Sequence, residues 1–291
     1  MTFCTRVIFL VWVLALAITP AAASDTSTTI CALSADLSKV IRWNAASSTW
    51  NQVGGAASAI YGGPVALLAT NPDNTAVFEY TSGTWKAIGN GGAQFVQVYG
   101  ALYGLTPNKG AVWEYLGLGP SSWIEIGGAA GKLYAGAVSE LFATNPAGNE
   151  LWHFVSGSTW EQVLSFEAPA DFAVDKDGNA YFLGDESLFL WSDNGTGWTP
   201  ILGCPQSGAI YVGGFGVFAG GTTSDGFLYH YTGGDSPWPT IGIGGESYAV
   251  SDEGVYGIGL GGASVYKWSG SGTIWNELQG SGPVSQIVPC P

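Results

Sequence analysis

Short runs of apolar and aromatic residues alternate with turn-forming residues along almost the whole chain. The segment from Trp85 to Trp123 contains four such runs, at 85–88, 95–98, 102–105 and 112–115. Each run is bounded by Gly, Pro, Asn or Ser, which is typical of strands joined by tight turns. No run has the length or the 3.6-residue periodicity of an amphipathic helix. The pattern therefore predicts an all-β chain.

The same four-strand unit recurs seven times. Tryptophans spaced 35 to 40 residues apart mark its last strand, and a second aromatic residue precedes each of them by five to eight residues. Linkers this short join neighbouring strands as antiparallel hairpins. The repeat therefore predicts a seven-bladed β-propeller of four-stranded antiparallel blades, with the large aromatic residues filling the gaps between blades. The tryptophans are Trp50, Trp85, Trp123, Trp160, Trp198, Trp238 and Trp275, and the preceding residues are Trp43, Tyr80, Tyr115, Phe154, Trp191, Tyr231 and Trp268.

Neither end of the chain supplies a complete unit. The N-terminal part begins with a second strand, Ile30–Leu33, and the C-terminal part ends with a first strand, Gln286–Val288. We expect these segments to pair in one blade, which closes the ring and leaves no exposed sheet edge. A disulfide between Cys31 and Cys290 would seal it and contribute on the order of 4–5 kcal/mol in the loop-closure model. Cys204 is left over, either as a buried thiol or as the site of an intermolecular bridge.

The first residues read as a secretory signal peptide. Met1–Arg6 carries one positive charge, Val7–Ile18 is continuously apolar, and Ala21–Ala23 offers small residues for cleavage. We expect residues 1–23 to be removed and residues 24–291 to fold as a single propeller domain. No later run is long enough to span a bilayer, and the last residues lack the hydrophobic tail of a lipid-anchor signal. A soluble, secreted, extracellular protein is expected.

The charge balance argues against two classes of partner. The chain has 8 basic and 22 acidic residues, for a formal net charge of −14. Such a chain repels phosphate backbones and anionic lipid surfaces, and Arg42 is the only arginine outside the expected leader. We therefore predict neither nucleic-acid binding nor membrane insertion.

The unit pattern resembles a known propeller repeat. It reads W-x-x-I/V, a glycine-rich turn, x-I/V-x-V, G-x-x-Y-G/A, and then aromatic-x-aromatic. This is similar to the tectonin repeat, and the segments 85–115 and 238–268 match it best. Tectonins and related tachylectin-like propeller lectins bind carbohydrates on microbial or cell surfaces through several weak sites. The resemblance implies the same activity here, although this chain has seven units where a tectonin usually has six, and its fifth unit is divergent.

Residues that could perform catalysis are few. The chain has no G-x-S-x-G, Walker-type or C-x-x-C motif. His153 and His230 occupy one position of the third strand two units apart, so we expect packing or solvated histidines and no shared metal. We predict a non-catalytic protein without cofactor or metal. A hydrolase with two spatially paired carboxylates remains an alternative, since such a pair need not be adjacent in sequence.

One acidic segment has the spacing of a calcium loop. Asp175, Asp177, Asn179 and Glu186 stand at positions one, three, five and twelve. However, the glycine comes too early, at Gly178, and strands flank the segment where a calcium loop requires helices. We interpret it as an ordinary turn between the first and second strands.

The sugar-binding hypothesis nominates residues of the third strand and its preceding loop. Sugars stack their C–H faces on aromatic rings and hydrogen-bond to amides or carboxylates, and these residue types occur together there. Packing accounts equally well for the aromatic residues, so a protein-interaction or structural propeller in the extracellular matrix is the rival hypothesis. A sequon at Asn194 predicts N-glycosylation in an exposed hairpin loop. The candidate sugar-binding residues are Asn108, Trp113, Glu114, Asn149, Trp152, His153, Asp225 and Tyr229.

Overall fold

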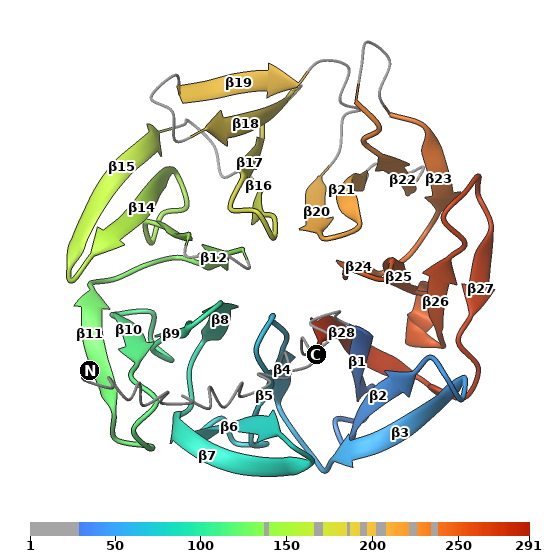
Figure 1. Cartoon of the computed structure of the whole chain (residues 1–291), viewed down its shortest axis with the longest axis horizontal. Helices are drawn as coiled ribbons and strands as arrows, with labels where there is room; N and C mark the ends of the chain where they lie inside the picture. Colours follow the sequence, from blue (N-terminus) through green and yellow to red (C-terminus); the bar gives the residue numbers. More distant parts are fainter. Residues whose placement is uncertain are drawn as a thin grey trace, which may run out of the picture.

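Seven four-stranded antiparallel sheets surround a common axis (Figure 1). The computed structural model describes residues 29–136, 140–165, 171–184, 187–192, 197–201, 208–220, 226–233 and 238–291. The predicted all-β fold of seven antiparallel blades is confirmed. The expected leader, Cys204 and Asn194 lie outside the described residues. In the described part, no helix is long and apolar enough to cross a membrane.

The innermost strand of each blade lies beside the axis and the fourth forms the outer edge. Blade 1 runs outward through β28 (Val284–Cys290), β1 (Thr29–Ser34), β2 (Val40–Asn44) and β3 (Thr49–Gly54). Each of the other blades uses four consecutive strands. Blade 2 contains β4 (Ala59–Tyr61), β5 (Leu67–Thr70), β6 (Ala76–Thr81) and β7 (Thr84–Asn90). Blade 3 contains β8 (Gln94–Val98), β9 (Ala101–Leu105), β10 (Val112–Tyr115) and β11 (Trp123–Gly127). Blade 4 contains β12 (Leu133–Ala135), β13 (Leu141–Thr144), β14 (Glu150–Ser156) and β15 (Thr159–Ser165). Blade 5 contains β16 (Asp171–Val174), β17 (Ala180–Leu183), β18 (Leu188–Ser192) and β19 (Gly197–Ile201). Blade 6 contains β20 (Ala209–Gly213), β21 (Gly216–Gly220), β22 (Phe227–His230) and β23 (Thr240–Ile243). Blade 7 contains β24 (Ser247–Val250), β25 (Val255–Ile258), β26 (Val265–Trp268) and β27 (Trp275–Glu277), with one 3-10 turn, η1 (Leu260–Gly262), between β25 and β26.

The two ends of the described chain close the ring as predicted. Strand β28 pairs antiparallel with β1, and Cys31 and Cys290 form a disulfide in which both residues are fully buried. The closing strand is longer than the segment Gln286–Val288 expected from sequence, because it begins at Val284 and continues to Cys290. Gln286 on this strand also holds the next blade: its amide donates to the carbonyl of Ile60 at 2.7 Å and accepts from the N–H of Ile60 at 3.0 Å.

Similar side-chain clamps join other pairs of innermost strands. Gln94 makes the same two hydrogen bonds to the backbone of Leu133, both at 2.8 Å. At the corresponding register position in blade 5, Asp171 accepts from the N–H of Ile210 at 2.9 Å. These contacts satisfy backbone groups of a strand that has a sheet neighbour on only one side. They therefore fix the innermost strands of adjacent blades to each other.

The recurrent tryptophans join the outer edges of the blades. In blades 1, 2, 3, 4 and 6 the ring packs on the aromatic residue of its own hairpin, as in the Tyr115–Trp123 pair at 5.0 Å between ring centroids. In six of the seven, the indole N–H donates to a backbone carbonyl of the preceding blade, in its fourth strand or directly after it. We therefore attribute this series to packing between blades, in agreement with the prediction. The donor–acceptor pairs are Trp50–Leu278, Trp85–Val53, Trp123–Ile88, Trp160–Ile126, Trp198–Val163 and Trp275–Ile241.

Trp238 differs from the other members of the series. It precedes β23 and does not lie within the strand, because Pro239 has no N–H to pair with β22. Its ring packs on Tyr231 at 5.1 Å, but its buried indole N–H has no hydrogen-bond partner among the described residues.

A glycine in the fourth strand makes room for the next blade's tryptophan. A Cβ atom at Gly89 would overlap the indole nitrogen of Trp123, whereas one at Gly128 would meet nothing within 4 Å. We expect Gly89→Ala to lower the free energy of unfolding by about 1–3 kcal/mol, since overpacking displaces the ring and its hydrogen bond. Urea denaturation monitored by circular dichroism measures the effect. Gly128→Ala is the matched control, and equal stability of the two variants would contradict this account of the glycine.

Candidate functional site: matching clefts between blades

A cleft of about 840 Å³ opens between blades 2 and 3. Its aromatic lining comes from blade 3, where Phe95 and Trp113 flank Gly104 across three neighbouring strands. Trp123 from the outer strand completes this lining. The rim consists of short polar side chains and proline. The rim residues are Asn74, Thr75, Asn90, Thr106, Pro107, Pro120 and Ser121.

Glycine is needed at Gly104 because aromatic rings occupy the space of a side chain. A Cβ atom there would stand 2.9 Å from the Phe95 ring and 3.2 Å from the Trp123 ring. Both distances are shorter than ordinary van der Waals contact. The glycine therefore allows two rings to lie over the bare backbone, and the cleft acquires a wide aromatic surface.

A second cleft, of about 670 Å³, has the same construction between blades 6 and 7. Tyr248 and Tyr266 flank Gly257 across three strands, and Trp275 closes the outer end. A Cβ atom at Gly257 would stand 3.0 Å from the Tyr248 ring. The two clefts therefore repeat one arrangement. The glycine and the two aromatic residues that flank it lie, in both cases, in the segments 85–115 and 238–268 that match the propeller repeat best.

A third, smaller cleft of about 320 Å³ lies between blades 3 and 4. Here Ala143 replaces the glycine and Leu133 replaces the inner aromatic residue. Trp152 lines this cleft, and its indole N–H donates to the carboxylate of Glu150 at 3.2 Å. The aromatic surface is thus reduced and carries a charge, which distinguishes this cleft from the other two.

The two tryptophans of the first cleft differ in their hydrogen bonds. Trp123 donates its indole N–H to the carbonyl of Ile88 at 2.7 Å and so belongs to the contact between blades. The indole N–H of Trp113 is buried and has no partner in the described part of the chain. Such a group costs about 1–3 kcal/mol relative to a satisfied one. Blade packing does not explain this side chain, so Trp113 is a candidate functional residue.

The other nominated residues do not gather around Trp113. Glu114 follows Trp113 in β10 and therefore faces the opposite side of the sheet. Burial, with a smaller contribution from the charge of Glu114, raises the pKa of Tyr103 on that side to about 12. Asn108 accepts hydrogen bonds from Thr106 and from the N–H of Gly110 within its own turn.

The remaining candidates are also placed apart from the first cleft. Asn149 accepts from the Asn145 amide at 2.7 Å within a turn of blade 4. Tyr229 lies in β22, opposite Ala219, at the register position that Trp113 and Tyr266 hold in their blades. Asp225 lies outside the described residues.

The two histidines pack against phenylalanine rings. His153 stacks on Phe142 at 4.7 Å and hydrogen-bonds to Glu140, and His230 stacks on Phe218 at 4.6 Å. Burial lowers the pKa of His230 below its usual value. Among the described residues, no group of three or more His, Cys, Asp or Glu side chains could hold a metal ion.

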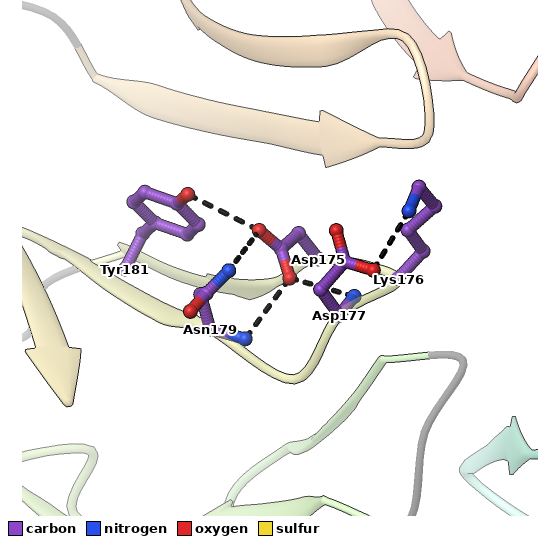
Figure 2. Close-up of polar contacts among 5 residues, drawn as sticks. All are labelled: Asp175, Lys176, Asp177, Asn179 and Tyr181. Atoms are coloured by element: carbon purple, nitrogen blue, oxygen red, sulfur yellow. Dashed lines mark hydrogen bonds and ion pairs between the residues drawn. The ribbon is translucent and has the colours of Figure 1, made fainter. Parts of the chain in front are cut away.

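The segment with calcium-loop spacing is organised as a turn (Figure 2). One carboxylate oxygen of Asp175 accepts from the backbone N–H groups of Asp177 and Asn179, both at 2.9 Å. The other accepts from the Asn179 amide at 2.8 Å and from the Tyr181 hydroxyl at 3.1 Å. Both oxygens are engaged in fixing the turn, as the turn interpretation predicts. Glu186 lies outside the described residues.

Sequence reasoning missed Phe95, Gly104, Tyr248 and Tyr266. A signal for them was present in the aligned units, because an aromatic residue in the third strand coincides with glycine in the second strand only in blades 3 and 7.

Comparison with known proteins supports the fold and leaves the family open. No protein-family model matches the chain, and no curated protein is similar to it. Similar solved structures include a functionally unknown protein from Desulfotomaculum acetoxidans (TM-score 0.62, 12% identity, covering 91% of this chain and 99% of that one). Apo AztD from Citrobacter koseri is also similar (TM-score 0.60, 11% identity, 90% and 98%), as is a catalytically inactive virginiamycin B lyase from Staphylococcus aureus with quinupristin (TM-score 0.52, 10% identity, 84% and 92%). At such low identity the likeness shows the propeller fold alone.

Proposed function

We propose that this protein is a secreted, non-catalytic lectin that binds sugars in the two matching clefts. The observation that carries the proposal is the repeated arrangement of aromatic rings around a glycine, in clefts between blades 2 and 3 and between blades 6 and 7. Aromatic rings accept the C–H face of a sugar, and short polar side chains at a rim accept its hydroxyl groups. Exposed Thr75, Asn90 and Ser121 supply such groups in the first cleft.

The lining of the clefts favours binding over catalysis. Among the described residues, neither cleft is lined by a carboxylate, histidine, lysine or cysteine, and Tyr248 and Tyr266 of the second cleft are the only titratable side chains. General acid–base chemistry requires a titratable group within hydrogen-bond reach of the substrate. Two sites on one chain would raise the apparent affinity for a polymeric or surface-bound glycan even if each site is weak.

A glycan array that includes methylated sugars and N-acetylglucosamine polymers tests the proposal. Binding to a defined set of sugars supports it. If the protein binds no sugar on the array, the result favours the rival hypothesis. In that hypothesis the propeller binds an extracellular protein or has a structural role in the matrix.

The Trp113→Ala variant tests the first cleft with a sugar identified on the array. We expect affinity for the monovalent sugar at this cleft to fall about tenfold, since loss of a stacking ring removes on the order of 1–2 kcal/mol. The Trp113→Ala/Tyr266→Ala double variant should lose binding to the array. Isothermal titration calorimetry measures both, with the melting temperature as a check of folding.

Trp152→Ala is the matched control, because it removes the corresponding residue from the third, smaller cleft. Its binding is expected to equal that of the wild type. Undiminished binding by a folded double variant would show that the sugar binds elsewhere.

A further inference from the structure

A separate pocket of about 600 Å³ lies on the axis of the propeller. It is formed where the innermost strands end, by the turns that lead from the first to the second strand in blades 2 to 7, together with Pro289 of blade 1. This position is at the centre of the ring in Figure 1 and involves none of the residues of the clefts between blades.

Glycines bring the turns close together around this pocket. A Cβ atom at Gly214 would overlap the carboxylate of Asp252, and one at Gly62 would overlap the carbonyl oxygen of Pro289. A Cβ atom at Gly136 would likewise overlap the carbonyl oxygen of Asp175. These positions require glycine because neighbouring turns occupy the space of a side chain. The packing of Gly214 against Asp252 places a carboxylate in the wall of the pocket.

Blade 5 adds a second carboxylate, that of Asp177, on a turn held by hydrogen bonds to Asp175. Asp175 is buried and its four hydrogen bonds fix the backbone of this turn (Figure 2). Lys176 and Asp177 extend from it on the side away from Tyr181 and are paired at 2.7 Å. The hydrogen bond to Asp177, together with the charges of Asp177, Asp175 and Asp252, raises the pKa of Lys176. Two carboxylates, those of Asp177 and Asp252, and the one ammonium of Lys176 line this side of the pocket, which therefore carries a net negative charge.

The opposite side of the pocket is apolar and aromatic. Tyr99, which follows β8, is 49% exposed, and Pro64 and Val96 lie in the same wall. Figure 1 places β8 and β24 on opposite sides of the axis, so Tyr99 and Asp252 approach the pocket from different directions. A tyrosine ring attracts a cation over its face and also packs against apolar groups.

We propose that the axial pocket binds a small organic ammonium ion with an apolar body. Asp252 and Asp177 hold its ammonium group, and Tyr99 and Pro64 contact its apolar part. The ligand competes with the ammonium of Lys176 for Asp177. This site is independent of the sugar-binding proposal, because the residues and the ligand chemistry both differ.

Benzylamine, which is protonated at pH 7, is a suitable probe, with benzyl alcohol as its uncharged counterpart. Titrations followed by ¹H–¹⁵N NMR should shift the backbone amides of Gly213, Gly214 and Ser251 for benzylamine and leave them unchanged for benzyl alcohol. Asp252→Asn should weaken binding about tenfold, since a charge-assisted hydrogen bond is lost. Lys176→Met should strengthen it severalfold, because the competing ammonium is removed.

Two controls separate a pocket from a general attraction to an acidic protein. Glu125→Gln removes one negative charge and Lys86→Met one positive charge on exposed outer strands, and neither should change the affinity for benzylamine. Equal effects of the pocket variants and of these controls would overturn the proposal, as would shifts distributed over the whole surface. Retained melting temperatures establish that each variant is folded.

Discussion

We expect the Trp123→Ala variant to unfold with a free energy about 3–5 kcal/mol below that of the wild type. The Trp123 ring packs on Tyr115 of its own hairpin and lies edge-on to the Phe95 ring, with 6.1 Å between the ring centroids. Its indole N–H donates a hydrogen bond to the carbonyl of Ile88 in the preceding blade. Removing it opens a cavity between blades 2 and 3 and leaves the Ile88 carbonyl without this donor. Urea denaturation followed by circular dichroism measures the change.

A second substitution separates the hydrogen bond from the ring. Trp123→Phe retains much of the buried ring surface and loses the indole N–H, so a decrease of about 1–2 kcal/mol is expected. Ile124→Ala is the matched control, because the neighbouring side chain is 43% exposed and faces the other side of β11. A Trp123→Ala variant that loses less than the control would show that the blades do not depend on this contact.

The fold was predictable because every blade repeats four short strands with aromatic residues at matching positions of its outer hairpin. The hairpin pairs illustrate this, since Trp43 lies opposite Trp50 and Trp268 opposite Trp275 as their spacing requires. Spacing within a unit is a local property of the chain. The ring closure was predictable for a related reason. Cys290 lies in a strand that has no partner in its own part of the chain, and Cys31 lies in a strand that pairs locally on one edge only.

The contacts between blades could not be derived in the same way. The clamp from Gln94 to Leu133 and the hydrogen bond from Trp123 to Ile88 depend on how one sheet sits against the next. The clefts depend on the same geometry, because Trp113 acquires its surroundings from Gly104 in its own sheet and from the edge of blade 2. Residue type alone made Trp113 and Glu114 equally good candidates for sugar binding. Because they are neighbours in β10, the pleat of the strand places their side chains on opposite faces of the sheet.

Removing the disulfide between Cys31 and Cys290 is expected to lower the free energy of unfolding by about as much as Trp123→Ala does. In the loop-closure model a bridge across 259 residues stabilises the folded chain by about 5 kcal/mol, because it restricts the unfolded ensemble. Alanine is the suitable replacement, since both cysteines are fully buried and serine would introduce unpaired hydroxyl groups. The Cys31→Ala/Cys290→Ala variant should therefore unfold at a much lower urea concentration.

The variant should nevertheless fold, and its weakest region should be blade 1. Strands β28 and β1 retain their antiparallel pairing, and Gln286 still binds the backbone of Ile60. Native-state hydrogen exchange should consequently become faster in β1 and β28 than in blades 3 and 4, because opening the ring no longer requires a covalent bond to break. Cys204→Ala, which leaves the bridge intact, is the control for loss of a thiol. Unchanged stability, or equal acceleration of exchange in all blades, would show that the disulfide is not what holds the ring closed.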